Sequence, residues 1–240
     1  SEIAEEMGWD VIEFKRKNWI KEGEELLMAK ALGEGREGFD QIIHSNGLEE
    51  CVRLGVEAVD WYSKRDQLNE DAEGPIRRGI GMAVMAHGSG IAGLDMGAAT
   101  LKMNDDGSFN LLIGATDIGT GSDTILAQMA AEELGATLDD MIVYSSDTDF
   151  TPFDKGAYAS STTYISGGAV RKAARRVADQ IRHHAATMLG TGVGEDAGLA
   201  LEEIELKNRA VWFPDGRNVS LEQVALSSLH QQDQHQIMDT

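Results

Sequence analysis

The sequence is nearly free of cysteine. Its single cysteine, Cys51, excludes an intramolecular disulfide, a zinc site made of several cysteines and a cysteine-ligated iron–sulfur cluster within this chain. A chain of 240 residues can bury a core large enough to fold without such cross-links. This composition suits a reducing compartment, and we expect a cytoplasmic protein.

Long apolar runs are also missing. Stretches such as IGMAVMA and ILAQMAA fall far short of the about 20 residues that a membrane-spanning helix needs. The first residues, SEIAEEMGWD, contain neither a basic region nor an apolar region, so no signal peptide is predicted. We therefore expect no membrane partner. The missing initiator methionine suggests that the sequence is cut from a longer protein.

Positive charge is scarce. The 21 Lys and Arg residues stand against 41 Asp and Glu residues, which gives a formal net charge of −20 at pH 7. Since affinity for nucleic acid depends on Lys and Arg that neutralise phosphates, a nucleic-acid partner is disfavoured. An acidic, solvated surface that keeps the protein dissolved is the ordinary reading of this charge.

Hydrophobic periodicity predicts helices in the first third of the chain. Apolar residues recur at helical spacing in residues 1–20, and a Gly/Glu-rich stretch follows, so residues 1–47 are predicted to form an N-terminal helix and linker. A second helix is predicted over residues 46–68, with Asn46 as a candidate cap.

The remainder predicts a mixed α/β domain over residues 48–230. Period-two patterns predict three strands, one in residues 79–90 and two in residues 97–116 around an Asp106-Gly107 turn. Further elements are expected in chain order: a helix ending near Gly135, a strand from Met141, a long helix over 169–189, a strand pair within 201–213, and a closing helix capped by Ser220. The tail, residues 231–240, has no core-forming pattern and is expected to be a linker.

The loop before the helix that ends near Gly135 is unusual. The stretch GATDIGTGSDTILAQMAAEELG, residues 114–135, sets glycines before a helix N-terminus, where backbone N–H groups can approach an anion closely. Its spacing matches neither common phosphate-binding signature, it has no lysine, and Asp117 and Asp123 would repel a bare phosphate. The alternative is a tight turn capped by Ser122 or Asp123. These residues alone favour the turn.

Two segments together resemble a known family. Residues 104–135 (NDDGSFNLLIGATDIGTGSDTILAQMAAEELG) and 147–174 (DTDFTPFDKGAYASSTTYISGGAVRKAA) are similar, in order and separation, to motifs of the molybdenum-cofactor-binding subunit of the xanthine dehydrogenase and aldehyde oxidase family, the molybdenum hydroxylases. The resemblance runs nearly end to end. It implies a mixed-sheet α/β fold, part of the molybdopterin-binding domain, and a fragment of the large subunit.

The resemblance also implies site residues. The cofactor-binding positions are Gly119, Thr120 and Gly121 in the first motif and Ala159, Ser160, Ser161 and Thr162 in the second. His87 and Ser89 lie where the family has one wall of its substrate channel, although a histidine in a glycine-rich turn is more often simply exposed. No metal-ligating side chain is expected in this chain. The sequence departs from the family pattern at Thr120, where glutamine is usual, and at Ser161, where arginine is common.

Three further residues are interpreted differently. Glu195, in TGVGEDAG, resembles the family's Gly-x-Gly-Glu element but comes too early in the chain, so we interpret it as part of a surface loop. The general-base glutamate of the family is expected beyond Thr240. His183 and His184 lack a carboxylate or further histidine at metal-binding spacing, and we expect them on a solvated helix face.

The resemblance implies that the parent enzyme hydroxylates an aldehyde or an N-heterocycle with oxygen from water. This segment would cradle the cofactor, molybdopterin or its cytosine dinucleotide form, and would be inactive alone. Iron–sulfur clusters and FAD are expected on other subunits or segments, which would be its partners together with a small-molecule substrate. Two alternatives stay open: a non-catalytic homologue, because of Thr120 and Ser161, and a phosphate- or nucleotide-binding domain.

Overall fold

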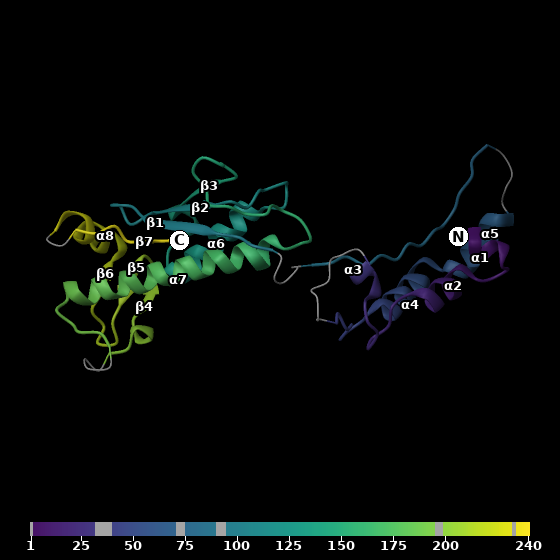
Figure 1. The fold of residues 1–240 in the computed structure, drawn as a ribbon, viewed down its shortest axis with the longest axis horizontal. Helices are drawn as coiled ribbons and strands as arrows, with labels where there is room; N and C mark the ends of the chain where they lie inside the picture. The colour runs from purple at the N-terminus through teal and green to yellow at the C-terminus, as the bar shows by residue number, and fades with distance from the viewer. Residues whose placement is uncertain (1, 32–39, 71–74, 90–94, 195–198, 232–233) are drawn as a thin grey trace. The chain divides into compact units, whose positions relative to one another are not determined.

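A computed structural model describes residues 2–31, 40–70, 75–89, 95–194, 199–231 and 234–240. The chain divides into two compact units, Ser1–Met85 and Ala86–Thr240 (Figure 1). This division differs from the boundary expected between residues 47 and 48. The reason is that the helices after residue 47 share a core with those before it.

The first unit is helical. Its helices are α1 (Glu2–Glu6), α2 (Val11–Asn18), α3 (Leu27–Ala31), α4 (Leu48–Val59) and α5 (Trp61–Glu70). Both predicted helices therefore exist, but each is interrupted, by Gly8 at φ 65° and by Asp60 at φ 51°. Buried Ile12, Val52 and Trp61 form the core of this unit.

The predicted strand in residues 79–90 is wrong for the residues described, because 79–89 form no strand. The alternating pattern has another cause. Ile80, Met82 and Val84 pack against the helical core of the first unit, while the residues between them are exposed. An extended chain lying on helices produces the same period of two as a strand in a sheet.

The second unit is built on a four-stranded sheet in the order β3-β2-β1-β7. β1 (Ala99–Met103) and β2 (Phe109–Ile113) form the predicted hairpin, and Leu101 pairs with Leu111. β3 (Met141–Ser145) runs parallel to β2, whereas β7 (Met238–Asp239) pairs antiparallel with β1. The predicted mixed α/β class is thus confirmed.

Two long helices pack on this sheet, α6 (Ser122–Leu134) and α7 (Thr162–Met188) (Figure 1). The buried positions of β1 and β2 alternate, so one face of the hairpin supplies the core. α7 begins earlier than the predicted residue 169. Gly167 disfavours a helix by propensity, but its bare backbone lets Met129 of α6 pack directly against α7, since a Cβ there would lie 2.7 Å from the sulfur of Met129.

A small second sheet completes this unit. Its strands are β4 (Glu205–Lys207), β5 (Ala210–Trp212) and β6 (Asn218–Ser220), and α8 (Leu221–His230) follows directly. Ser220 caps α8 as predicted, accepting from the N–H of Gln223 at 3.1 Å. Gln223 Oε1 accepts in return from the N–H of Ser220 at 3.0 Å, which completes a capping box. Short 3₁₀ turns precede β3 and β4, at Leu138–Asp140 and Leu201–Glu203.

The end of the chain is not a free linker. Ile237 is fully buried, Met238–Asp239 forms β7, and Gln180 Nε2 donates to the carbonyl of Met238 at 2.9 Å. Arg176 pairs with Asp239 at 3.1 Å. One apolar residue and two backbone positions are too few to give a periodic pattern, which is why the sequence did not predict this. Among the described residues, no helix combines the length and the hydropathy needed to span a membrane.

Candidate functional site

Asp117 organises the first sequence-predicted loop, between β2 and α6. Its Oδ1 atom accepts hydrogen bonds from the N–H groups of Gly119 (2.8 Å), Thr120 (3.0 Å) and Gly121 (3.2 Å). Its Oδ2 atom accepts from the N–H of Asp123 at 3.4 Å. Gly119 and Gly121 have φ values of 94° and 73°, which glycine adopts without strain. These N–H donors, that of Gly119 first, hold the pKa of Asp117 below its usual value.

This arrangement bears on the two interpretations of the loop, a capped turn and an anion-binding loop. The cap of α6 is supplied by Asp117, because Gly121 occupies the N-cap position and neither Ser122 nor Asp123 forms a side-chain cap. Asp117 therefore braces the loop from within. Because Asp117 already accepts from these N–H groups, they are not available to a bare phosphate, and the case for a phosphate-binding loop is weakened.

The start of α6 also carries polar atoms without partners. Ser122 is 6% exposed, and its hydroxyl has no hydrogen-bond partner among the described residues. Asp123 Oδ1 is also buried and has no hydrogen-bond partner among the described residues, although Asp123 Oδ2 accepts from the hydroxyl of Ser145 at 2.9 Å. Leaving a buried polar atom unsatisfied costs about 1–3 kcal/mol. This end of the helix therefore offers polar groups that the described chain does not satisfy.

The second predicted loop lies between β3 and α7, at residues 146–161. Ala159 and Ser160 have φ values of 48° and 51°, a left-handed conformation that costs a non-glycine residue about 1–2 kcal/mol. Such strain concentrates at functional sites. Ser161 is buried and its hydroxyl donates to the carbonyl of Tyr158 at 2.9 Å, whereas Ser160 is exposed and Thr162 half-buried.

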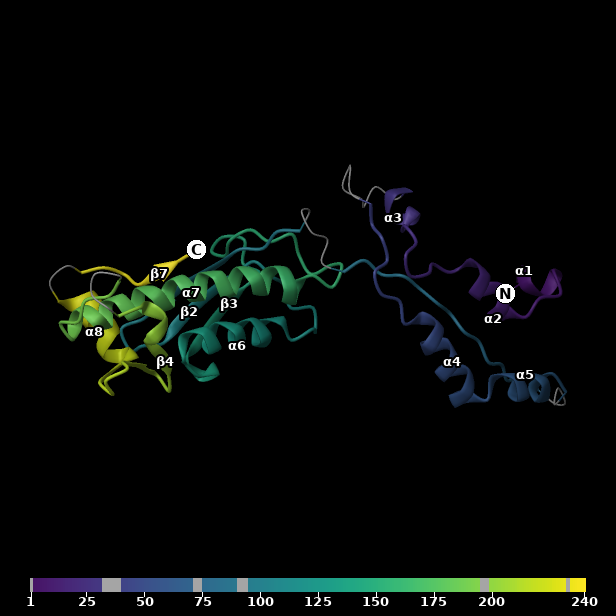
Figure 2. The ribbon, with the colours of Figure 1, turned by 90° about the horizontal axis from the view of Figure 1, so that it is seen from below.

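The two loops lead into the N-terminal ends of two neighbouring helices, α6 and α7. α6 and α7 lie side by side (Figure 2), with Gly167 beside Met129 and Arg171 Nε 3.0 Å from Glu133 Oε1. Since contacts advance along both helices in the same direction, α6 and α7 run parallel. The positive ends of both helix dipoles, and the residues preceding them, therefore lie at one end of the second unit.

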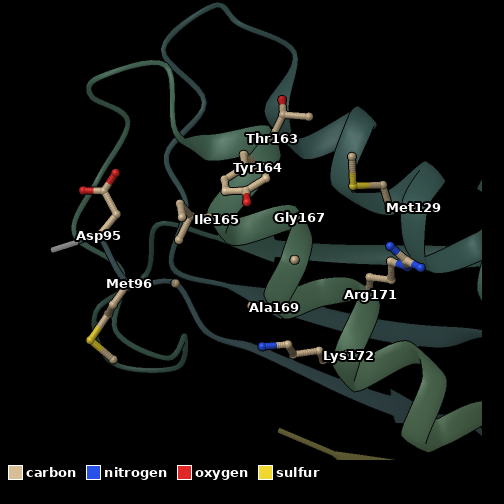
Figure 3. A pocket seen from close by; sticks show the side chains of 12 residues that line it. Asp95, Met96, Met129, Thr163, Tyr164, Ile165, Gly167, Ala169, Arg171 and Lys172 are labelled. Carbon is tan, nitrogen blue, oxygen red and sulfur yellow. The ribbon is translucent and has the colours of Figure 1, made fainter. Parts of the chain in front are cut away.

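A hollow of about 650 Å³ lies beside the first turns of α7 (Figure 3). Tyr164, Arg171 and Lys172 of α7 line it together with Met129 of α6 and Met96 before β1. None of the sequence-predicted site residues is among its lining residues. The double glycine at 167–168, which leaves the helix surface bare between larger side chains, is the sequence signal that could have indicated it.

The structure does not join the remaining candidates to the loops. His87 and Ser89 are exposed, and within the described part of the chain no hydrogen bond or ion pair links either of them to residues 117–121 or 158–162. Glu195 lies outside the described residues. Where the chain is described, no group of three or more His, Cys, Asp and Glu side chains is arranged to hold a metal ion.

One histidine was placed wrongly. His183 is exposed as expected, but His184 is half-buried, hydrogen-bonded through Nε2 to Ser227 Oγ at 2.9 Å, with its ring centre 5.0 Å from that of His235. Burial, and then the charge of His235, lower the pKa of His184. α8 covers a helix face that the sequence alone presented as solvated.

Comparison with known proteins connects these loops to a family. A family model described as a molybdopterin cofactor-binding domain matches residues 54–238, which is more than half of the chain. This range contains both loops and the parallel helices that follow them.

The relatives are named as an oxidase and as a molybdenum-binding subunit. Over 196 residues the chain is 39% identical to the probable hypoxanthine oxidase XdhD of Escherichia coli (strain K12), covering 81% of this chain and 20% of that protein. Over 191 residues it is 38% identical to the putative xanthine dehydrogenase molybdenum-binding subunit XdhA of the same strain, covering 78% of this chain and 24% of that protein. The chain thus spans about a fifth to a quarter of these relatives.

A solved structure shares the fold. The crystal structure of quinoline 2-oxidoreductase from Pseudomonas putida 86 matches with a TM-score of 0.60 at 18% identity, covering 98% of this chain and 30% of that chain. The family model and the two relatives carry the assignment further than the fold alone. The chain belongs to the family of molybdopterin cofactor-binding domains found in xanthine dehydrogenase-type molybdenum-binding subunits.

Proposed function

We propose that the loops before α6 and α7 cradle a molybdenum–pterin cofactor in an oxidoreductase that hydroxylates an N-heterocycle with oxygen from water. The observation that carries the proposal is the placement of both family motifs at the N-terminal ends of two parallel helices. That placement gathers polar groups of two distant segments at one end of the second unit.

The groups present there fit such a cofactor. A pterin ring presents amine, N–H and carbonyl groups, and its side chain ends in phosphate, so it needs several donors and acceptors. Thr120, Ser160 and Thr162 have hydroxyls that make no hydrogen bond within the described chain, and Ser122 has a buried hydroxyl without a partner. The positive end of the α7 helix dipole, where no side chain caps the backbone N–H groups, favours the phosphate.

The chain's own contribution is binding and orientation. When bound, the cofactor supplies the redox-active molybdenum centre. Asp117 fixes the first loop from within, so that the side chain of Thr120 is exposed at its tip. We propose that a glutamate in sequence beyond Thr240 acts as the general base, and that iron–sulfur clusters and a flavin lie on other subunits or segments.

The substrate class rests on the relatives' names. Hypoxanthine oxidase and xanthine dehydrogenase act on purine-type N-heterocycles, and these proteins share 38–39% identity with this chain. We therefore propose an N-heterocycle, in preference to an aldehyde, as the substrate. A non-catalytic homologue is the second candidate, favoured by Thr120 and Ser161 at positions where the family usually has glutamine and arginine.

The test is elemental analysis and pterin extraction on the full-length parent protein, expressed with molybdate, followed by assays with hypoxanthine and with an aldehyde. We expect near one molybdenum and one pterin per chain and turnover of the N-heterocycle. Thr120→Gln should retain the cofactor. Full cofactor without any turnover would favour the non-catalytic homologue, and absence of both metal and pterin would refute the proposal.

A further inference from the structure

Asp154 joins the second loop to α7. Its Oδ1 atom accepts a hydrogen bond from the N–H of Gly156 at 2.8 Å, and its Oδ2 atom accepts from the hydroxyl of Ser166 at 2.7 Å. Ser166 is only 4% exposed and belongs to the beginning of α7. One carboxylate thus links the middle of the loop to the helix that the loop precedes.

Two glycines, one just before β1 and one just after β2, make room for this link. A Cβ at Gly97 would lie 2.9 Å from Asp154 Oδ2 and 3.0 Å from the Cα of Ser166. At Gly114 it would lie 2.7 Å from the Cβ of Asp154 and 2.2 Å from the carbonyl oxygen of Pro152. The loop therefore passes over the start of β1 and the end of β2 at two positions where any side chain would displace it.

The residues beyond this link are the strained ones. Ala159 and Ser160 take up left-handed backbone conformations that L-residues avoid, so their surroundings must hold them. The holding contacts are those of Tyr158, whose hydroxyl bonds to Asp95 and whose carbonyl accepts from the N–H and the hydroxyl of Ser161. Asp154 fixes the residues directly before this turn.

We propose that Asp154 is a positioning residue, which through Ser166 holds the turn at residues 158–161 in the conformation that receives the cofactor. The inference rests on the proposed function. Asp154 does not itself contact the cofactor; it sets the place of the exposed hydroxyl of Ser160 relative to the N-terminus of α7. Outer partners of this kind typically change affinity for the group by about tenfold or more when removed.

The first test measures pterin content of the full-length protein after expression with molybdate. Asp154→Ala and Ser166→Ala should each lower bound pterin by about tenfold. Asp154→Asn should stay near the wild type, because its amide can accept from Gly156 and donate to Ser166. The matched control is Asp149→Ala in the same loop, since the exposed carboxylate of Asp149 makes no hydrogen bond or ion pair within the described chain.

The second test measures amide hydrogen exchange and thermal unfolding of the cofactor-free protein. Asp154→Ala and Ser166→Ala should speed exchange in residues 156–161 and leave exchange in the sheet unchanged. Wild-type pterin content in both variants would overturn the inference alone, as would an equal loss in Asp149→Ala. Pterin loss matched by a fall in the unfolding midpoint and faster exchange throughout the unit would show a general structural role instead. A wild-type protein without pterin would refute the proposed function and the inference together.

Discussion

The two loops before the parallel helices differ in how far they depend on residues outside the loop to keep their shapes. The loop before α6 uses glycines at its left-handed positions and a carboxylate from within, Asp117, which accepts from four nearby N–H groups. The loop before α7 has Ala159 and Ser160 at such positions in addition to Gly156, and it depends on partners outside the loop, among them Ser166 and Asp95. A self-contained loop tolerates changes in its surroundings. An externally held loop transmits them.

The largest effect on stability is expected from a substitution outside the second loop that displaces this loop. Gly114→Ala would place a Cβ 2.2 Å from the carbonyl oxygen of Pro152, and we expect the free energy of unfolding to fall by about 3 kcal/mol. Denaturant unfolding measures this, with Gly168→Ala as control, since a Cβ at Gly168 meets nothing within 4 Å. Equal stability of the two variants would contradict the inference that contacts outside the second loop hold it in place.

The next prediction concerns the pH dependence of the first loop. The folded-state pKa of Asp117 is lowered, so the folded state binds fewer protons and the contribution of Asp117 to stability is present above its unfolded pKa of about 3.9. That contribution is lost as the pH falls through the folded-state pKa. Asp117→Asn should therefore unfold at a lower temperature than the wild type at pH 7, and the two unfolding temperatures should converge once the pH lies below the folded-state pKa. A difference that persists in acid would rule out the charge as the cause.

A smaller effect is expected at the start of α6. Ser122→Ala removes a buried hydroxyl that has no partner within the described chain, so the cofactor-free protein should gain about 1 kcal/mol of stability. The same change should reduce pterin content if this hydroxyl meets the cofactor. Thermal unfolding and pterin extraction on one preparation measure both, and a loss of stability would mean that the hydroxyl already has a partner.

The smallest effect tests the backbone difference itself. Ala159→Gly should relieve left-handed strain and raise stability by about 0.5 kcal/mol, the net of relieved strain and added unfolded-state entropy. Gly119→Ala should do the reverse, because its φ of 94° suits glycine alone. Chemical denaturation of both variants measures the pair, and effects of the same sign would show that the loops do not differ in this respect.

The sequence predicted most of the elements and the two motifs because these depend on local order. The hairpin at Asp106-Gly107, the long α7 and the Ser220 cap all follow from patterns a few residues long. The failures come from distant partners. Burial alternates within residues 79–89 because this segment lies on helices. α7 contains Gly167 because Met129 packs against it, and His184 is half-buried because α8 covers it.

The site was predicted less completely than the fold. The motifs gave the residues of both loops but not their support, since Asp117, Asp154 and Ser166 act through hydrogen bonds that span turns and segments. The buried hydroxyl of Ser122 could be found only once α6 was packed on the sheet. Residue identity therefore indicated the two loops, and three-dimensional packing showed which of their polar groups are already hydrogen-bonded within the chain.

The closing strand has a consequence for synthesis. β7 pairs with β1, and Ile237 enters the core of a unit whose first strand begins at Ala99. During synthesis on the ribosome, the edge of β1 stays unpaired and the core position of Ile237 stays unfilled until residues 237–239 have left the exit tunnel. Contacts so distant in sequence slow folding and expose an unpaired strand edge meanwhile. Premature release of the chain before Ile237 would therefore yield a domain prone to aggregation.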